Sequence, residues 1–258
     1  MDNQPPSIQD LKQQFIEFND SCDHRMLNCA AHMIINIESP KHVVQIGLEF
    51  LVSELSTCRA DAGFATPQHD SYTPIAEFRN SLRNPLSIIG LNLPNQHPAM
   101  QSVWKSSTPV VINDVTTDEN LFDLKKAFLE VGCKSMLLMK LLWEQQPIGI
   151  ACIDYTNETH KWNDREISFM NSFCSTFLGP LAGISNYWFN PKMHTMFSKP
   201  TDSELAAIRL AANGLTYKQI ADKLGKSTRT IENQFRNARS RLNAKNQIDL
   251  VKKCQHWL

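Results

Sequence analysis

The segment from Thr201 to Val251 constrains the fold more than any other part of the chain, because it has the periodicity of four short helices. The third helix begins at Ser227-Thr228, where a hydroxyl can cap an unpaired backbone N–H. Apolar residues then recur at spacings of four, three and four, which place them on one stripe of a helix. They are Ile231, Phe235, Ala238 and Leu242. The sequence therefore predicts a helix with one face buried in a small domain.

The opposite stripe of this helix carries polar side chains that suit nucleic acid. It consists of Arg229, Glu232, Asn233, Arg236, Asn237 and Ser240. Long cations bond to phosphates, whereas amides and carboxylates bond to base edges. A shorter helix from Tyr217 to Leu224 precedes it, with Gly225 and Lys226 as the turn. Two short helices joined by a glycine-containing turn, the second polar outside and apolar inside, indicate a helix-turn-helix.

The charge distribution separates this helical segment from the rest of the chain. Residues 191–258 contain thirteen Lys and Arg against five Asp and Glu, whereas residues 1–190 contain thirteen against twenty-one. The net charge of zero therefore hides a basic C-terminal part and an acidic body. A cationic helix face alone is usually just a solvated surface. The asymmetry favours a C-terminal unit that faces double-stranded DNA.

The same segment resembles the LuxR-type helix-turn-helix of bacterial transcription regulators. The residues that carry the resemblance are Thr201, Glu204, Gly214, Lys218, Ile220, Ala221, Leu224, Ser227, Thr230, Ile231, Leu242, Leu250 and Val251. The resemblance implies that Glu232, Asn233 and Arg236 read bases in the major groove. It implies phosphate contacts for Lys218, Thr228, Arg229 and Arg239.

Three positions depart from the family pattern. Glu232 stands where Lys is common, Lys226 where an apolar residue usually precedes the Ser, and Gln247 where Arg usually sits. Glu232 lowers nonspecific attraction to phosphates and can accept a hydrogen bond from cytosine N4. We therefore expect an unusual target sequence, and some loss of packing at Lys226.

Length and composition limit the remaining possibilities. The 258 residues suffice for one domain of about 150 residues and a small one. No apolar run approaches the ~20 residues that span a bilayer, and the N-terminus lacks the features of a signal peptide. We therefore expect a cytoplasmic protein without a membrane partner. The seven cysteines form no CxxC pair and predict free thiols. We expect neither a metal nor a cofactor.

Between residues 41 and 187, helical and strand patterns alternate. Segments 136–143 and 148–155 are strongly apolar and are joined by a tight connection, which predicts an antiparallel hairpin covered on both faces. Helices are predicted at 43–55, 98–105 and 121–131 and from Asn163 onward, strands at 71–79 and 110–112, and a short Ala/Gly segment near 60–65. This predicts an α+β domain, an antiparallel sheet flanked by helices, followed by a small all-α domain. The predicted boundaries are a helical extension at 1–40, the α+β domain at 41–188, a linker at 189–200 and the helix-turn-helix domain at 201–258.

The α+β segment resembles a GAF domain, a small-molecule-sensing relative of the PAS fold, over about 145 residues. The resemblance rests on residues 108–115, 131–135, 147–149 and 161–173, and Lys140 departs from it where the family commonly has Pro. It implies a ligand between the sheet and the helices that cover one of its faces. The candidate lining residues are Phe78, Trp104, Phe122, Phe128, Met136, Leu138 and Trp143. Core packing also explains each of them, because a ligand pocket is itself mostly apolar.

The last helix of this domain has a heptad seam, which suits the same helix of a second subunit or the domain's own sheet. The seam consists of Ile167, Met170, Cys174, Phe177, Leu181, Ile184 and Trp188. Pro180 interrupts it and predicts a kink or break after Leu178-Gly179.

Together these features favour a sequence-specific bacterial transcription regulator that binds DNA as a homodimer and responds to a small molecule. An acyl-homoserine-lactone receptor is an alternative, although the Trp, Tyr and Asp-Pro cluster it should have is absent between Ser71 and Pro109. A DNA-binding module regulated by a protein partner is another. A thiol-dependent GAF-type reductase using Cys133 is a third, but the chain has no Gly-rich phosphate loop, HExxH or GxSxG motif, so we expect no enzyme.

Overall fold

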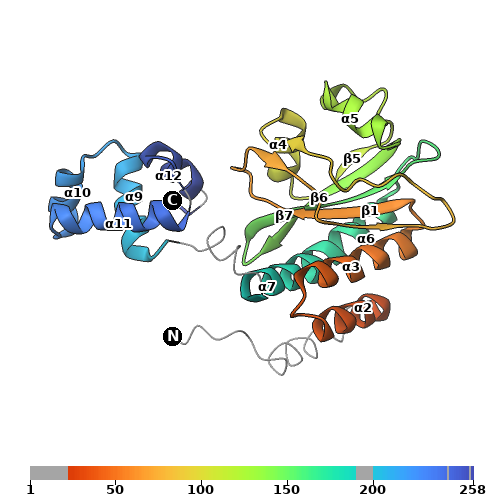
Figure 1. Cartoon of the computed structure of the whole chain (residues 1–258), viewed down its shortest axis with the longest axis horizontal. Helices are drawn as coiled ribbons and strands as arrows, with labels where there is room; N and C mark the ends of the chain where they lie inside the picture. Colours follow the sequence, from red (N-terminus) through yellow and green to blue (C-terminus); the bar gives the residue numbers. More distant parts are fainter. Residues whose placement is uncertain (1–22, 190–199, 243, 256) are drawn as a thin grey trace. The chain divides into compact units, whose positions relative to one another are not determined.

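The computed structural model describes residues 23–189, 200–242, 244–255 and 257–258. Its contacts divide the chain into two compact units, 1–189 and 190–258, and each is described by itself (Figure 1). The predicted linker, apart from Phe189 and Pro200, and the first part of the predicted N-terminal extension lie outside the described residues.

The first unit is built on a five-stranded antiparallel sheet in the order β3-β1-β7-β6-β5. Its strands are β1 (Arg59–Phe64), β3 (Ala76–Arg79), β5 (Val110–Ile112), β6 (Ser135–Trp143) and β7 (Gln146–Tyr155). A separate pair joins β2 (Ser71–Tyr72) to β4 (Leu93–Pro94). The strand predicted at 71–79 is thus two strands, because Pro74 between them has no N–H to donate. The Ala/Gly segment near 60–65 lies mostly within β1, beside the central strand β7.

Helices cover both faces of this sheet (Figure 1). One face carries α2 (His24–Ile35), α3 (Pro40–Leu55), α6 (Asp164–Phe173) and α7 (Gly179–Phe189). The other carries α4 (Pro98–Lys105), a 3-10 turn (Glu119–Leu121) and α5 (Leu124–Glu130). The end of the predicted extension forms α2, whose buried residues pack on α3. The predicted α+β class with an antiparallel sheet flanked by helices is confirmed.

The hairpin of β6 and β7 forms as predicted, and its turn has a clear local cause. Glu144 and Gln145 both have positive φ, 48° and 63°, as a two-residue type I′ turn requires. Every residue of β7 from Ile148 onward is buried, so both faces of this strand are covered. The helix predicted at 121–131 is instead interrupted at Phe122, where φ is 46° and the helical path cannot continue.

The last helix begins at a capping box of Asn163 and Glu166, and it does not break at Pro180. A π-helical turn from Cys174 to Leu178 precedes the proline and absorbs the irregularity, so the helix runs on to Phe189. In the predicted seam Met170, Cys174, Phe177 and Leu181 are buried within the unit, and Ile167, Ile184 and Trp188 are half-buried. Packing against its own domain therefore occupies the middle of the seam.

This helix is also long and apolar enough to cross a membrane by length and composition: it has 26 residues, and an 18-residue stretch within it has a mean hydropathy of 1.2. The sequence-based expectation overlooked it, because the apolar positions are interleaved with Ser, Thr and Asn. Half of its apolar window is buried in the described unit. It is therefore accounted for as the core helix of the α+β domain.

The second unit contains α9 (Asp202–Ala212), α10 (Tyr217–Leu224), α11 (Thr228–Arg241) and α12 (Gln247–Cys254). Capping boxes start two of the helices, Thr201 with Glu204 at α9 and Thr216 with Gln219 at α10. Gly225 ends α10 with a φ of 61°, which glycine adopts without strain. The four helices surround one apolar core, so the predicted tetrahelical domain is confirmed.

Candidate DNA-recognition helix and ligand pocket

Helix α11 buries the predicted apolar stripe. Ile231, Phe235, Ala238 and Leu242 are between 0% and 7% exposed. The Phe235 ring packs on Tyr217 of α10, with centroids 4.8 Å apart. This contact fixes the helix against α10, so the polar stripe on the other side points away from the core.

The side chains predicted to contact DNA lie mostly on the exposed surface of α10 and α11. Lys218, Thr228, Arg229, Glu232 and Arg236 are exposed, and Asn233 and Arg239 are half-buried. The Arg236 guanidinium donates to Asn233 Oδ1, which holds two predicted base-reading side chains together. Asn237 is also exposed, whereas the side chain of Ser240 lies outside the described residues. The stripe offers cations, an amide and a carboxylate on one face, which is the chemistry that phosphates and base edges require.

The turn before α11 is held by polar contacts that the sequence did not reveal. Lys226 Nζ donates to Ser203 Oγ on α9, and Gln234 Nε2 donates to the same oxygen at 2.7 Å. Ser227 Oγ accepts from Thr230 N at 3.1 Å and so caps the helix. Lys226 therefore ties the turn to α9, which replaces the packing that an apolar residue would have supplied.

A second candidate site lies in the first unit, on the face of the sheet that α4 and α5 cover. It is a cavity of about 430 Å³ over β5 and β6. Its lining is Pro98, Ala99, Met100, Ser102, Val103, Ser106, Val110, Val111, Ile112, Asp118, Asn120, Leu121, Phe122, Leu124, Phe128, Met136 and Leu138. A volume of this size and a mostly apolar lining are typical of small-molecule sites.

Four of the seven predicted lining residues meet in this cavity: Phe122, Phe128, Met136 and Leu138. Trp104 packs in the same apolar cluster, and its indole N–H donates to Asn95 Oδ1 at 2.8 Å. The other two lie elsewhere. Phe78 borders a different hollow beside Lys41 and Gln45 of α3, and Trp143 packs on Tyr187, with ring centroids 5.0 Å apart.

Sequence reasoning missed the lining residues of α4 and β5. Met100 and Val103 of α4 and Val110 and Ile112 of β5 all face the cavity. The pairing of Val110 with Leu138 and of Ile112 with Met136 places these four strand residues on one face. Only that register, which joins distant parts of the chain, separates them from ordinary core residues.

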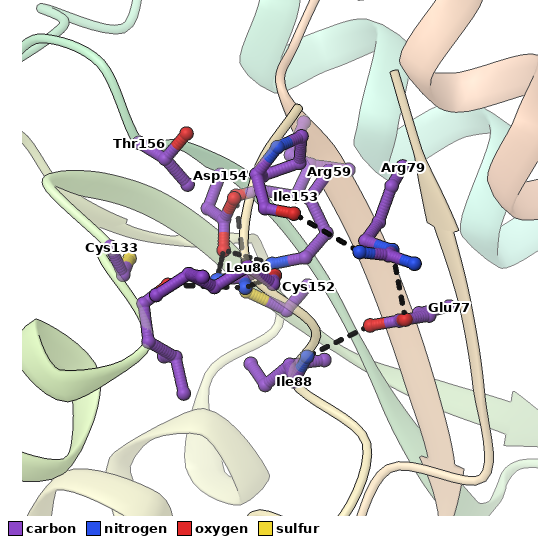
Figure 2. A network of polar contacts seen from close by, with 12 residues as sticks. Arg59, Glu77, Arg79, Leu86, Ile88, Cys133, Cys152, Ile153, Asp154 and Thr156 are labelled. Carbon is purple, nitrogen blue, oxygen red and sulfur yellow. Dashed lines mark hydrogen bonds and ion pairs between the residues drawn. The ribbon is translucent and has the colours of Figure 1, made fainter. Parts of the chain in front are cut away.

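A buried polar cluster occupies the same sheet face over β1 and β7 (Figure 2). Arg59 and Asp154 are 0% and 1% exposed, and Arg59 Nε donates to Asp154 Oδ2 at 3.0 Å. Arg59 Nη1 donates to the carbonyls of Leu86 and Val131. Asp61 lies beside this pair, and its Oδ2 and Asp154 Oδ1 lack hydrogen-bond partners among the described residues.

Burial sets the protonation of this cluster. Burial and, after it, the charge of Asp154 raise the pKa of Asp61 to about 8, although Arg59 opposes the shift. Burial also raises the pKa of Asp154 to about 6, although Arg59 stabilises its carboxylate. Asp61 is thus held protonated near neutral pH, whereas Asp154 pairs with the guanidinium.

The two thiols of this cluster do not suit thiol chemistry. Burial raises the pKa values of Cys133 and Cys152 well above their usual range. A reactive cysteine needs the opposite shift, because the thiolate is the nucleophile. Among the residues the structure describes, no group of three or more His, Cys, Asp or Glu side chains is arranged to hold a metal ion.

An exposed polar recognition helix in one unit and a pocket-bearing domain in the other define a transcription regulator with a sensory domain. The family comparisons agree with this assignment. The sequence-family model of the GAF domain matches residues 24–177, which include α2. The family model of the bacterial regulatory proteins of the luxR family matches residues 201–254. The chain belongs to the GAF domain family and carries a LuxR-type helix-turn-helix domain, and both predicted resemblances are confirmed.

Solved structures support the fold of the first unit. The phycoerythrobilin-bound GAF domain of a cyanobacterial phytochrome is similar at 15% identity and a TM-score of 0.51, covering 66% of this chain and 98% of its own. The phycocyanobilin-bound GAF domain of a cyanobacterial phytochrome is similar at 16% identity and a TM-score of 0.50, covering 66% and 99%. At these identities the likeness concerns the fold alone. No curated protein matches this sequence.

Proposed function

We propose that this protein is a sequence-specific bacterial transcription regulator whose operator binding changes when a small molecule occupies the cavity over β5 and β6. The observation that carries the proposal is the presence of two surfaces of different chemistry in one chain. One is the exposed polar stripe of α11, and the other is the apolar cavity of about 430 Å³ in the GAF domain. We expect the protein to act in the cytoplasm.

In this proposal α11 lies in the major groove. Glu232, Asn233 and Arg236 read base edges, because they lie together on the stripe opposite the buried one. Phosphate contacts come from Lys218, Thr228, Arg229 and Arg239. One such helix reads only a few base pairs, so two copies of the chain bind half-sites about one helical turn apart.

The ligand acts through a difference in affinity. It changes operator binding only if it binds the DNA-competent arrangement of the chain more tightly, or less tightly, than the incompetent one. By linkage, operator DNA then changes ligand affinity by the same factor.

The test begins with selection of an operator from random duplex DNA by the full chain. Operator affinity is then measured with and without a small-molecule extract of the host. The proposal predicts a selected sequence and a shift in affinity with the extract. Failure to select any sequence would contradict the DNA-reading role, and an unchanged affinity would contradict modulation by a small molecule.

One observation favours a protein partner as the alternative regulator. The segment after edge strand β3 exposes large apolar side chains: Leu82 is 95% exposed, Leu86 60% and Ile89 49%. Clustered exposed apolar side chains commonly mark protein-binding surfaces. If the Leu82→Ser, Leu86→Ser double variant bound its operator normally in vitro but lost regulation in cells, this alternative would replace small-molecule modulation.

A further inference from the structure

We propose that the cavity over β5 and β6 binds a neutral, largely apolar molecule and discriminates against anions. This inference rests on the proposed ligand-sensing function and names the class of ligand. Five features of the cavity carry it: its floor, its walls, its polar groups, its charge and its opening.

The floor of the cavity is entirely apolar. Val110 and Ile112 of β5 lie opposite Leu138 and Met136 of β6 in the antiparallel register. Because paired residues project from the same face of a sheet, all four side chains lie beneath the cavity. Met136 is 0% exposed and Leu138 is 5% exposed, so the floor of the cavity is shielded from water.

The walls are apolar as well. Met100 and Val103 line the cavity from α4, and Leu124 and Phe128 line it from α5. All four are buried. A ligand between these helices and the sheet exchanges water for apolar contacts, which favours molecules with apolar surface.

The polar groups of the lining are largely engaged within the protein. Ser102 Oγ donates to the Ala99 carbonyl at 2.7 Å, and Ser106 Oγ donates to the Thr108 carbonyl at 2.6 Å. The Asp118 carboxylate accepts from Asn120 N at 2.9 Å. These contacts leave few groups to balance the charge of a ligand.

The formal charge of the lining is negative. Among the described residues, Asp118 is the one charged lining residue, and no Lys, Arg or His lines the cavity. Two nearby lysines are directed to carbonyl groups: Lys125 Nζ donates to Thr116 O at 3.3 Å, and Lys140 Nζ donates to Trp104 O at 3.0 Å. An anion in the cavity would lose hydration without gaining a cationic partner, so a neutral molecule binds better.

Phe122 forms the opening. It lines the cavity, yet 61% of it is exposed, and its φ of 46° lies in the region that favours glycine. His97, the N-cap residue of α4, holds this segment: its ring lies 6.0 Å from the Phe122 ring, and its Nε2 lies 2.9 Å from Asp123 Oδ1. An apolar ligand covers the exposed ring and so gains contact area at the opening.

Two fluorescent probes with one scaffold test the inference on the full chain. N-phenyl-1-naphthylamine is neutral, and 8-anilino-1-naphthalenesulfonate adds one sulfonate to the same rings. We expect the neutral probe to bind at least about tenfold more tightly, a difference equal to about 1.4 kcal/mol. Asp118→Asn keeps a side chain able to cap the 3-10 turn, and it should tighten binding of the sulfonate while leaving the neutral probe unchanged.

A matched pair of variants assigns the signal to the cavity. Phe122→Ala should weaken the neutral probe several-fold, whereas Phe78→Ala, which removes the same ring from a different hollow, should leave it unchanged. Since Phe122 is mostly exposed, its loss should leave the circular dichroism spectrum intact.

Three results would overturn the inference: no binding of the neutral probe, equal or tighter binding of the sulfonate, or equal losses in the two Phe variants. Each can arise while host extracts still shift operator affinity, in which case the proposed function stands without this ligand class. Conversely, if the probe binds as expected but no small molecule alters operator binding, the inference stands and the proposed function fails.

Discussion

Helix α11 and the cavity of the GAF domain both depend on an apolar core, but they use it in opposite ways. In α11 one stripe of side chains packs in the core, whereas the side chains proposed to contact DNA lie on the opposite stripe, which is exposed and polar. In the GAF domain the functional surface is itself part of the core, so side chains that pack the domain also line the cavity. Substitutions should therefore separate stability from function in α11 and affect both around the cavity.

The largest expected effect comes from the buried stripe of α11. Phe235→Ala removes a ring that is 1% exposed, and we expect a loss of about 3–5 kcal/mol in unfolding free energy of the helical unit. Arg229→Ala on the exposed stripe is the control and should change stability by less than about 0.5 kcal/mol. Chemical denaturation of both variants measures the difference. Similar losses of unfolding free energy in the two variants would show that the two stripes contribute alike to stability.

The next effect concerns the buried acids beside the cavity. The folded protein keeps the Asp61 proton up to about pH 8, whereas the unfolded chain releases it near pH 4. Folding takes up a proton between these values, so stability falls as pH rises through this window, by up to about 1.4 kcal/mol per pH unit. Asp61→Asn should reduce this slope and raise stability at pH 8 relative to the wild type.

Denaturation curves at pH 6 and pH 8 measure the slope, with Asp154→Asn as the contrast. That second substitution leaves the buried guanidinium of Arg59 without its carboxylate partner and should destabilise the protein at both pH values. An unchanged slope in the Asp61→Asn variant would mean that Asp61 is ionised in the folded state near neutral pH.

On the exposed stripe, Arg236→Ala should weaken binding to the selected operator by about 1–3 kcal/mol. Binding to random DNA should change much less, because the proposed contact is to a base. Arg165→Ala, which removes an exposed arginine of the GAF domain, is the control for lost charge. Equal losses on operator and random DNA would reassign Arg236 to a phosphate contact.

The smallest expected effect is that of Glu232→Lys. Replacing the carboxylate by a cation should tighten binding to random DNA and increase the slope of log K against log salt concentration by about 1. The ratio of operator affinity to random-DNA affinity should fall. Titrations at several salt concentrations measure all three quantities. A stronger preference for the operator would contradict a base-reading role for Glu232.

The difference between the two regions also explains what the sequence could reveal. The spacing of Ile231, Phe235 and Ala238 is local, so helical periodicity alone predicts which face of α11 is buried. Lining residues of the cavity have no such signal. Phe78 and Leu138 are both strand residues of apolar type, and only the sheet pairing shows that Leu138 borders the cavity and Phe78 does not.

Strand β1 shows the same limit for the fold. Its residues Arg59 and Asp61 place ionisable side chains in the interior of the sheet, where apolar alternation is normally expected. They are tolerated because Asp154, 95 residues further along the chain, pairs with Arg59, and because burial keeps Asp61 protonated. No local pattern in the sequence contains that compensation.

The most direct test of the account is whether occupancy of the cavity changes operator binding. Val103 lines the cavity from α4, and Val103→Phe should fill part of the space. Operator affinity is measured for the full wild-type chain and this variant, each with and without the host small-molecule extract. We expect the extract to shift the operator affinity of the wild type and to have little effect on that of the variant. Equal responses of the two proteins, or no response in either, would contradict it.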